Sequence, residues 1–366
     1  MKRLRLGLAL AALALLALTG CSALPYYWQS AVGHLRLMQA ARPVPDWLAD
    51  PATPDWLRQR LALAQRMRAF AVRQLHEPDN ASYTRYADLH RRAAVWSVAA
   101  APADSLTLKT WCYPVVGCAG YRGYYDASAA ERFAAGLRAH EGLETTVYGV
   151  PAYSTLGWMN WAGGDPLLST FIRYPEGELA RLIFHELAHQ IVYVQNDTAF
   201  NESFAVAVER LGVARWLATE AGPAARAEYA AFDERRQAFR QLTLDTRRQL
   251  ARVYERNSAS ASASRAQAAT KEEVMQGFRE RYAALKAQWR AEGRPFDGYD
   301  RWVAQANNAA FGLQAAYDQW VPAFEALFAR QGADWPRFYA AVKALAELPQ
   351  PARQAHLQAQ SAATRP

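Results

Sequence analysis

The stretch Arg181–Ala205 reads RLIFHELAHQIVYVQNDTAFNESFA. His185 and His189 stand four residues apart, so on a helix they share one face and both imidazoles can reach a single zinc ion. Glu186 lies about 100° further round such a helix, outside the coordination sphere but close enough to act as a general base. The alternative interpretation is a structural helix that carries two histidines by coincidence.

A catalytic zinc site needs a third protein ligand, and the residues after His189 offer three options. In the HExxHxxGxxH pattern, positions 192 and 195 would be Gly and His, but here they are Val192 and Gln195, which excludes that class. Asp197 lies about two turns beyond His189, and a continuing helix would carry it away from the metal. Glu202 follows a polar break and opens a second helix that can fold back, so it is the predicted third ligand.

Two helices separated by the polar break are expected to carry these residues. Apolar residues recur every three or four positions across Glu178–Val194, which predicts an amphipathic helix with one buried face. The run Asn196-Asp197-Thr198 breaks this helix. Asn201 is expected to cap the second helix, which continues to about Thr219, and to support the metal ligands from outside the coordination sphere.

Other side chains are candidates for supporting roles at such a site. Glu209 lies on the same helix face as Glu202, where it is either a hydrogen-bond partner of a ligand histidine or an exposed surface acid. Peptide hydrolysis at zinc also uses a hydrogen-bond donor for the oxyanion, and the sequence does not rank three candidates: Tyr153, Tyr193 and Tyr317. The remaining histidines lack a partner at ligand spacing and are expected to be incidental: His34, His76, His90, His140 and His356.

The N-terminus has the features of an export signal. A basic leader precedes the apolar run Leu6–Leu18, which is too short to span a bilayer but suits a signal-peptide core. The following Leu18-Thr19-Gly20-Cys21 resembles the lipobox of bacterial lipoproteins, which implies removal of residues 1–20 and lipidation of Cys21. An ordinary secretory signal with a chance cysteine is the alternative. Ser22 favours the outer membrane, so the expected location is the periplasmic side of a bacterial membrane.

Composition limits the class of protein and its partners. Cleavage would leave 346 of the 366 residues, enough for one large domain or two modest ones, and 51% hydrophobic residues supply a core. Loss of the three leader cations lowers the formal charge from +8 to +5. In an exported protein this mild basic excess suggests anionic lipid or cell wall nearby and argues against nucleic acid.

Cys112 and Cys118 are the cysteines that would remain beside the lipidated one, in the segment WCYPVVGC. In the periplasm such a close pair predicts a disulfide, and the segment offers neither the histidine nor the third thiol of a zinc site. Short runs rich in Val, Tyr and Thr predict strands at 94–99 and 145–153. A helix is expected at 128–140.

The rest of the chain has mostly helical patterns, so we expect an α+β fold with a small sheet and a C-terminal helical hairpin. Residues 26–92 predict helices broken by proline, with a loop at 41–56. Apolar stripes at 224–256 and 271–290 predict the hairpin, around a flexible loop at 257–269. The hairpin is interpreted as structural, with a substrate lid as the alternative. Further helices at 299–320 and 335–348 and a frayed polar tail at 349–366 complete the chain.

Several segments resemble a bacterial family of predicted zinc aminopeptidases, which are often lipoproteins. NESFA after HELAH is also similar to the glutamate motif of the thermolysin-like clan, with a shorter link of 12 residues between His189 and Glu202. The segments are WCYPVVGCAGYRGYYD (111–126), AYSTLGW (152–158), HELAHQ (185–190), NESFA (201–205), NNAAF (307–311) with the following Tyr317, and WVPAF (320–324).

The resemblance implies a zincin-like catalytic core that binds one zinc ion through His185, His189 and Glu202, with Glu186 as the base. Because the composition changes after Gly222-Pro223, we expect the catalytic region with its N-terminal helices in 21–222 and a helical region that completes the fold in 223–348. The resemblance also implies that an edge strand at 145–153 pairs with an extended peptide substrate, as in thermolysin-like enzymes, and a buried structural strand is the alternative.

The expected function is therefore zinc-dependent peptide hydrolysis. Trimming from the amino terminus would need carboxylates to hold the free amine, and Glu144, Asp165 and Glu178 are available. A G-x-M-E-N-like motif is missing, because Gly157-Trp158-Met159-Asn160 lacks its glutamate, so exopeptidase and endopeptidase activity stay open. The alternative function is a non-catalytic lipoprotein that binds peptides or envelope partners, against which the intact Glu186 argues. The sequence does not determine the oligomeric state.

Overall fold

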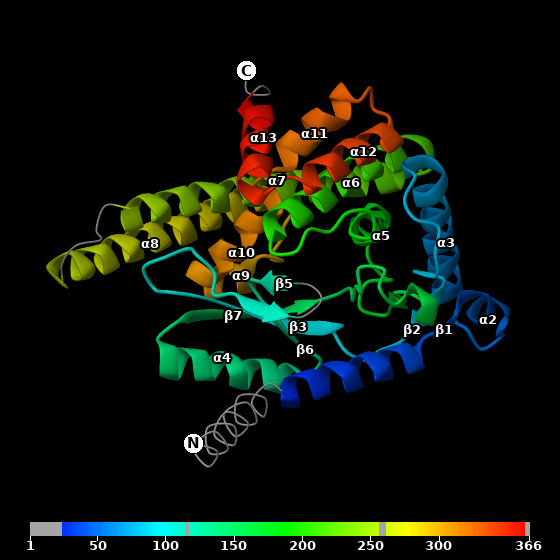
Figure 1. Cartoon of the computed structure of the whole chain (residues 1–366), viewed down its shortest axis with the longest axis horizontal. Helices are drawn as coiled ribbons and strands as arrows, with labels where there is room; N and C mark the ends of the chain where they lie inside the picture. The colour runs from blue at the N-terminus through cyan, green and yellow to red at the C-terminus, as the bar shows by residue number, and fades with distance from the viewer. Residues whose placement is uncertain (1–23, 114–116, 256–260, 363–366) are drawn as a thin grey trace, which may run out of the picture.

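The computed structural model describes residues 24–113, 117–255 and 261–362. The expected signal peptide at 1–20 and Cys21 lie outside these residues. Helices dominate the described chain and pack with small sheets, in agreement with the α+β expectation (Figure 1). Within the described residues, no helix is both long and apolar enough to cross a membrane.

The main core forms where α3 (Asp55–Leu75), α5 (Glu176–Ala188) and α6 (Thr198–Thr219) pack together. Pro175 precedes α5, and acidic residues in its first turn suit the positive end of the helix dipole. The expected helix 178–194 ends instead at Ala188, and residues 190–197 form two turns joined by irregular chain. Helix α6 is buried on nearly every side over its first three turns, so it is the central element of this core.

Strand β3 (Val95–Ala101) is the middle of an antiparallel sheet, between β6 (Arg122–Tyr124) and β7 (Glu144–Val150). The strands expected at 94–99 and 145–153 are thus present with shifted ends. Both α4 (Ala127–Glu141) and α10 (Asn308–Asp318) pack on β3 and β7. Because β7 lies at the edge of the sheet, one of its sides has no strand partner in the described chain.

The region expected to be helices and loop at 26–92 also contains elements that its sequence pattern did not indicate. Residues 41–56 include a short strand and a short helix, because Pro45 at the helix start fixes a helical backbone angle. A three-stranded sheet of order β1-β2-β8 forms beside α3. These elements are β1 (Arg42–Pro43), α2 (Val44–Ala49), β2 (Arg85–Ala87) and β8 (Leu167–Leu168).

Helices α7 (Pro223–Glu255) and α8 (Ala261–Ala291) form the expected hairpin, which extends away from the rest of the molecule (Figure 1). The prediction of a flexible loop at 257–269 is wrong for residues 261–269. These residues are helical because the alanine-rich run has high helix propensity. Residues 257–260 lie outside the described chain. The helix expected at 299–320 is divided into α9 (Asp300–Gln305) and α10, and Asn307 caps α10 by accepting from Ala310 N.

The prediction of a frayed tail at 349–366 is wrong for 350–362, and residues 363–366 lie outside the described chain. After α11 (Val321–Arg330) and α12 (Trp335–Ala346), the chain forms α13 (Gln350–Ala362), which packs on α11 (Figure 1). Leu357 is fully buried, and the buried Arg353 donates from Nε and Nη2 to Asp197 Oδ2 at 3.0 and 2.8 Å. The polar composition of this segment therefore does not indicate the helix, which the buried ion pair between Arg353 and Asp197 attaches to the core.

We expect Arg353→Leu to lower the free energy of unfolding by about 3–5 kcal/mol, because it leaves the Asp197 carboxylate buried without a counter-charge. Urea unfolding followed by circular dichroism measures this change. Gln358→Leu, at an exposed position of α13, is the matched control and should change stability little. Equal stability of the two variants would contradict a stabilising role for the ion pair.

Candidate metal centre

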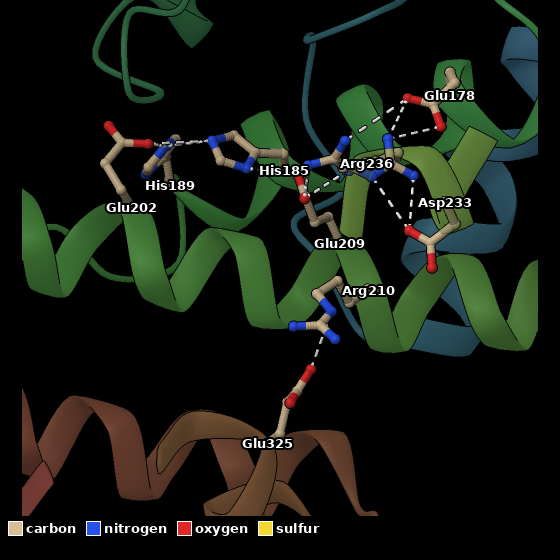
Figure 2. Close-up of polar contacts among 10 residues, drawn as sticks. Glu178, His185, His189, Glu202, Glu209, Arg210, Asp233, Arg236 and Glu325 are labelled. Atoms are coloured by element: carbon tan, nitrogen blue, oxygen red, sulfur yellow. Dashed lines mark hydrogen bonds and ion pairs between the residues drawn. The ribbon is translucent and has the colours of Figure 1, made fainter. Parts of the chain in front are cut away.

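Three donor atoms converge where α5 ends and α6 begins. His185 lies in the last turn of α5, His189 is its C-terminal cap, and Glu202 lies in the second turn of α6. His185 Nε2 lies 3.2 Å from His189 Nε2 and 3.4 Å from Glu202 Oε2, and the third side of this triangle, His189 Nε2 to Glu202 Oε2, is 3.6 Å (Figure 2). All three side chains are largely buried.

This triangle fits a tetrahedral metal ion. Ligands bound at about 2.0–2.1 Å in tetrahedral geometry lie about 3.3–3.4 Å from one another, which is close to the three observed separations. Two imidazoles and a carboxylate are also a common donor set for a catalytic metal with an open fourth position. The His185, His189 and Glu202 group could therefore hold a metal ion, and the described chain contains no other His, Cys, Asp or Glu group of this kind.

Asn201 fixes the turn that returns the chain to the metal site. Its Oδ1 accepts from Val194 N and its Nδ2 donates to Val194 O, both at 2.8 Å. The expectation that Asn201 caps α6 is wrong: Asp197 is the cap and accepts from Phe200 N at 3.1 Å. Asn201 instead clamps the turn after His189, which positions the adjacent Glu202.

A buried polar network holds the other side of this turn. Gln190, directly after His189, accepts from Asn80 Nδ2 at 2.7 Å and donates to Ser82 Oγ at 3.1 Å. Ser82 in turn accepts from the backbone N of Asp165 at 3.1 Å. The HELAHQ segment is therefore tied to loops that lie far from it in sequence.

Glu209 contacts a candidate ligand directly. Its Oε2 lies 2.9 Å from His185 Nδ1, and its Oε1 accepts from Arg181 Nε at 2.6 Å. Arg181 also contacts a second carboxylate, because its Nη1 lies 3.7 Å from Glu178 Oε2. Arg236 of α7 donates to both oxygens of Glu178 at 2.8 and 2.9 Å (Figure 2). These contacts connect the helical hairpin to His185, and the sequence did not indicate the two arginines.

The charges at the site stabilise one another despite their burial. Burial would raise the pKa of Glu202, but the charge of His189 and hydrogen bonds from both histidines lower it to about 2. Burial would likewise lower the pKa of His185, yet hydrogen bonds to Glu202 and Glu209 raise it well above its ordinary value. The pocket thus favours positive charge between these carboxylates, as a metal cation would supply.

Glu186 is partly exposed and does not belong to the converging donors. Its charge acts on the residues across the site, since it contributes to the raised pKa values of Asp165, Tyr121 and Tyr317. Glu186 is therefore coupled electrostatically to residues around the donor group, although it is not one of the donors.

The structure separates the three candidate tyrosines. The charge of Glu202, followed by burial, raises the pKa of Tyr317 well above its ordinary value, and burial followed by the same charge raises the pKa of Tyr193. Tyr153 instead lies 2.9 Å from His34 Nδ1 through its hydroxyl. Tyr317 and Tyr193 therefore lie within the field of Glu202, a candidate ligand, whereas the hydroxyl of Tyr153 contacts His34.

The charge of Glu202 also acts on two further tyrosines, Tyr121 and Tyr148. Burial and then the charge of Glu202 raise the pKa of Tyr121, and burial raises the pKa of Tyr148, with Glu202 contributing. Tyr121 belongs to the tyrosine-rich segment GYRGYYD, which was the available signal in the sequence. Tyr148 lies on β7 and carries no signal that separates it from an ordinary strand tyrosine.

A disulfide-bonded hairpin contacts the turn between His189 and Glu202. Cys112 and Cys118 are bonded and pair across β4 (Trp111–Tyr113) and β5 (Gly117–Ala119). Cys118 N donates to Asn196 Oδ1 at 2.7 Å, and Asn196 has a positive φ of 65° that asparagine tolerates well. The hairpin therefore braces the segment that joins His189 to Glu202.

Comparison with known proteins gives one match. A family model described as "Putative aminopeptidase" matches residues 25–357, which include every residue of the metal centre. Neither a curated protein nor a solved structure shows significant similarity to the chain.

Proposed function

The chain belongs to the family described as "Putative aminopeptidase", and from this membership we propose that it is a zinc-dependent peptidase with a zincin-like catalytic core. The single observation that carries the proposal is the triangle of donor atoms from His185, His189 and Glu202, with sides of 3.2–3.6 Å. Two histidines and a carboxylate suit zinc, and one ion per chain is expected.

The residues then have distinct tasks. His185, His189 and Glu202 would hold zinc, which when bound polarises the scissile carbonyl and lowers the pKa of water to about 7. Glu186 would take the proton of the attacking water and pass it to the leaving amine. Tyr317 is the favoured donor to the oxyanion, because the charge of Glu202 is the largest cause of its raised pKa, whereas burial is the largest cause for Tyr193.

The edge strand β7 offers a place for the peptide backbone. Residues of a strand direct their backbone groups to alternate edges. Val150 O accepts from Ala94 N on the β3 side, so the alternate residues Gly149, Val147 and Thr145 face the open edge. Asn307 Nδ2 already binds Thr145 O, which leaves Val147 and Gly149 for an extended substrate.

The carboxylates considered for an amino-terminal ammonium group all have internal partners. Amino-terminal trimming therefore rests on family membership, and peptides with free and acetylated amino termini distinguish exopeptidase from endopeptidase activity. Glu144 accepts from Asn308 N at 2.8 Å, Glu178 accepts from Arg236 at 2.8 and 2.9 Å, and Asp165 accepts from Thr155 N and Oγ1 at 2.9 and 2.7 Å.

The direct test combines metal analysis with a peptide digest. The purified protein should contain one zinc ion and cleave members of a peptide library, and a chelator should abolish cleavage until zinc is restored. A metal-loaded protein that cleaves none of the peptides would favour the binding function without turnover.

We further propose that Glu209 positions His185 for the metal. Glu209→Gln should weaken zinc binding about ten- to a hundredfold, because glutamine cannot supply the negative charge that orients the imidazole. Competition with a chromophoric chelator measures the affinity. Glu325→Gln is the matched control, since it breaks the neighbouring pair to Arg210 (3.2 Å) without touching His185, and it should not alter the affinity (Figure 2). An unchanged affinity in Glu209→Gln would reject the positioning role.

The protein is also proposed to be attached by lipid to the periplasmic side of a bacterial membrane, with the outer membrane favoured. The support is the signal-like N-terminus and its lipobox-like Cys21. Cys21→Ala should leave the membrane fraction or accumulate with its signal uncleaved. A correctly processed Cys21→Ala chain that stays in the membrane pellet would show that lipid on this residue does not hold it there.

A further inference from the structure

The helix of residues 24–40 is packed on one side only. Gln29 Nε2 donates to Gly123 O at 3.4 Å and Gln29 Oε1 accepts from Tyr125 N at 3.1 Å. Gly33 lies against the ring of Tyr125, so closely that a Cβ would collide with it, and Leu37 is buried. These contacts attach the helix to β6 and the residue that follows it, next to the sheet (Figure 1).

The opposite side of the same helix is exposed and apolar. Leu24, Trp28, Ala31 and Leu35 follow one another at spacings of four, three and four residues, so they form a single stripe along the helix. Leu24, Trp28 and Leu35 are 65%, 70% and 56% exposed, and Tyr27 lies beside them at 43%. We call Leu24, Trp28, Ala31 and Leu35 the apolar stripe.

The concentration of these side chains on one helix calls for a covering partner. Four of the seven large hydrophobic residues that are exposed in the described chain lie on this helix of 17 residues. Scattered exposed apolar residues are ordinary, but a continuous stripe along a helix typically marks a surface that contacts another phase or molecule. Tryptophan, tyrosine and leucine together are the composition of helices that lie in a membrane interface.

The position of the helix identifies the partner. Its first described residue, Leu24, follows the expected lipid attachment point at Cys21 by only three residues. An acyl anchor at that point would hold the start of the helix within about 10 Å of lipid headgroups, the extended length of three residues. We propose that the apolar stripe lies in the interface of a phospholipid bilayer, as a second attachment beside the lipid. The choice of occupant rests on the proposed lipid attachment, but the surface itself can be tested without it.

Such a contact would fix the orientation of the catalytic domain. One lipid-modified residue is a flexible tether that lets the domain rotate freely, whereas an adsorbed helix restricts that rotation. The packed side of the helix is rigidly joined to the sheet through Gln29 and Gly33, so the sheet would take a defined angle to the membrane. Weak adsorption of the helix is sufficient to restrict this rotation, because it adds to the membrane binding that the lipid anchor already provides.

The test uses a chain that begins at Ser22, which keeps every residue that the structure describes and lacks the lipid. Flotation with vesicles of phosphatidylcholine and phosphatidylglycerol measures its partition. Leu24→Ser/Trp28→Ser/Leu35→Ser should lower the vesicle-bound fraction about tenfold or more, since the apolar area that inserts is removed. Melting temperature and cleavage of a soluble peptide should not change, because the three side chains are exposed.

Trp158→Ser/Trp161→Ser is the matched control, because these tryptophans are 65% and 82% exposed on a different loop, and it should bind vesicles like the parent. Failure of the parent to bind vesicles, or equal losses in the two variants, would overturn the proposal. A parent chain that is dimeric in ultracentrifugation and becomes monomeric with the stripe variant would also overturn it, in favour of self-association. None of these results depends on Cys21, so they are separate from the fractionation of Cys21→Ala.

Discussion

Glu186→Gln is expected to abolish peptide hydrolysis while the protein keeps its zinc ion. Glutamine has the shape of glutamate but cannot accept the proton of the attacking water, and a general base contributes about 10²–10⁴ to the rate. Because Glu186 is absent from the converging group of His185, His189 and Glu202, its replacement removes no metal ligand. We expect kcat to fall by about a thousandfold or more, with one zinc ion still bound.

Metal analysis and steady-state kinetics on the same preparation check both halves of this prediction. Glu131→Gln changes an exposed glutamate of α4 in the same way and should leave kcat and zinc content unaltered. Peptide cleavage by Glu186→Gln at the parental rate would refute the proposed base. Loss of zinc from this variant would instead show that Glu186 contributes to metal binding.

The histidine pair was predictable because the spacing of residues within one helix is fixed by helix geometry. His185 and His189 need only the backbone of α5 and its cap to meet. The sequence predicted that Glu202 would join the two histidines, but not how close it would lie to them. That distance depends on the shape of a turn, which no simple sequence pattern predicts. That turn is held by Asn201, which the sequence pattern favoured as a helix cap.

Hydrophobic periodicity predicted burial better than it predicted helix ends. Ile191 and Val194 continue the apolar pattern of α5 and do pack against the core, but the helix ends at Ala188. A turn can bury apolar side chains as well as a helix can, so the pattern alone cannot locate the boundary. The additional turn residues are what return the chain from α5 to α6.

Long-range polar partners were beyond reach of the sequence. Arg353 reads as an ordinary residue of a polar tail, yet it forms a buried ion pair with Asp197, 156 positions away. Arg236 is one of many arginines in a charged segment, and its contact with Glu178 follows only from the docking of α7 on α5. Such pairs form when separate helices meet, and no local pattern specifies which charges will face one another.

Glu202→Ala is expected to remove the metal, and with it all hydrolysis. Two histidines alone fill only half of the positions of a four-coordinate ion and leave the others to weak ligands such as water. The affinity for zinc should therefore fall by several orders of magnitude. The buried Glu202 carboxylate lies 3.4 and 3.6 Å from the Nε2 atoms of His185 and His189, so its loss leaves a bound dication with less compensating negative charge. His185→Ala and His189→Ala should behave alike.

Thermal unfolding with and without added zinc distinguishes this result from simple misfolding. Zinc that binds only the folded parent should stabilise it by about 4 kcal/mol when present at roughly a thousand times its dissociation constant, whereas Glu202→Ala should gain almost nothing. Glu202→Gln is the conservative companion, because its amide oxygen keeps the size and position of the ligand but lacks the charge, and an intermediate zinc shift is expected. If Glu202→Ala binds one zinc ion as tightly as the parent, the third ligand must be another residue. The proposed contact of Glu202 with the metal would then be wrong, while the pair of histidines and the base at Glu186 would each remain open to their own tests.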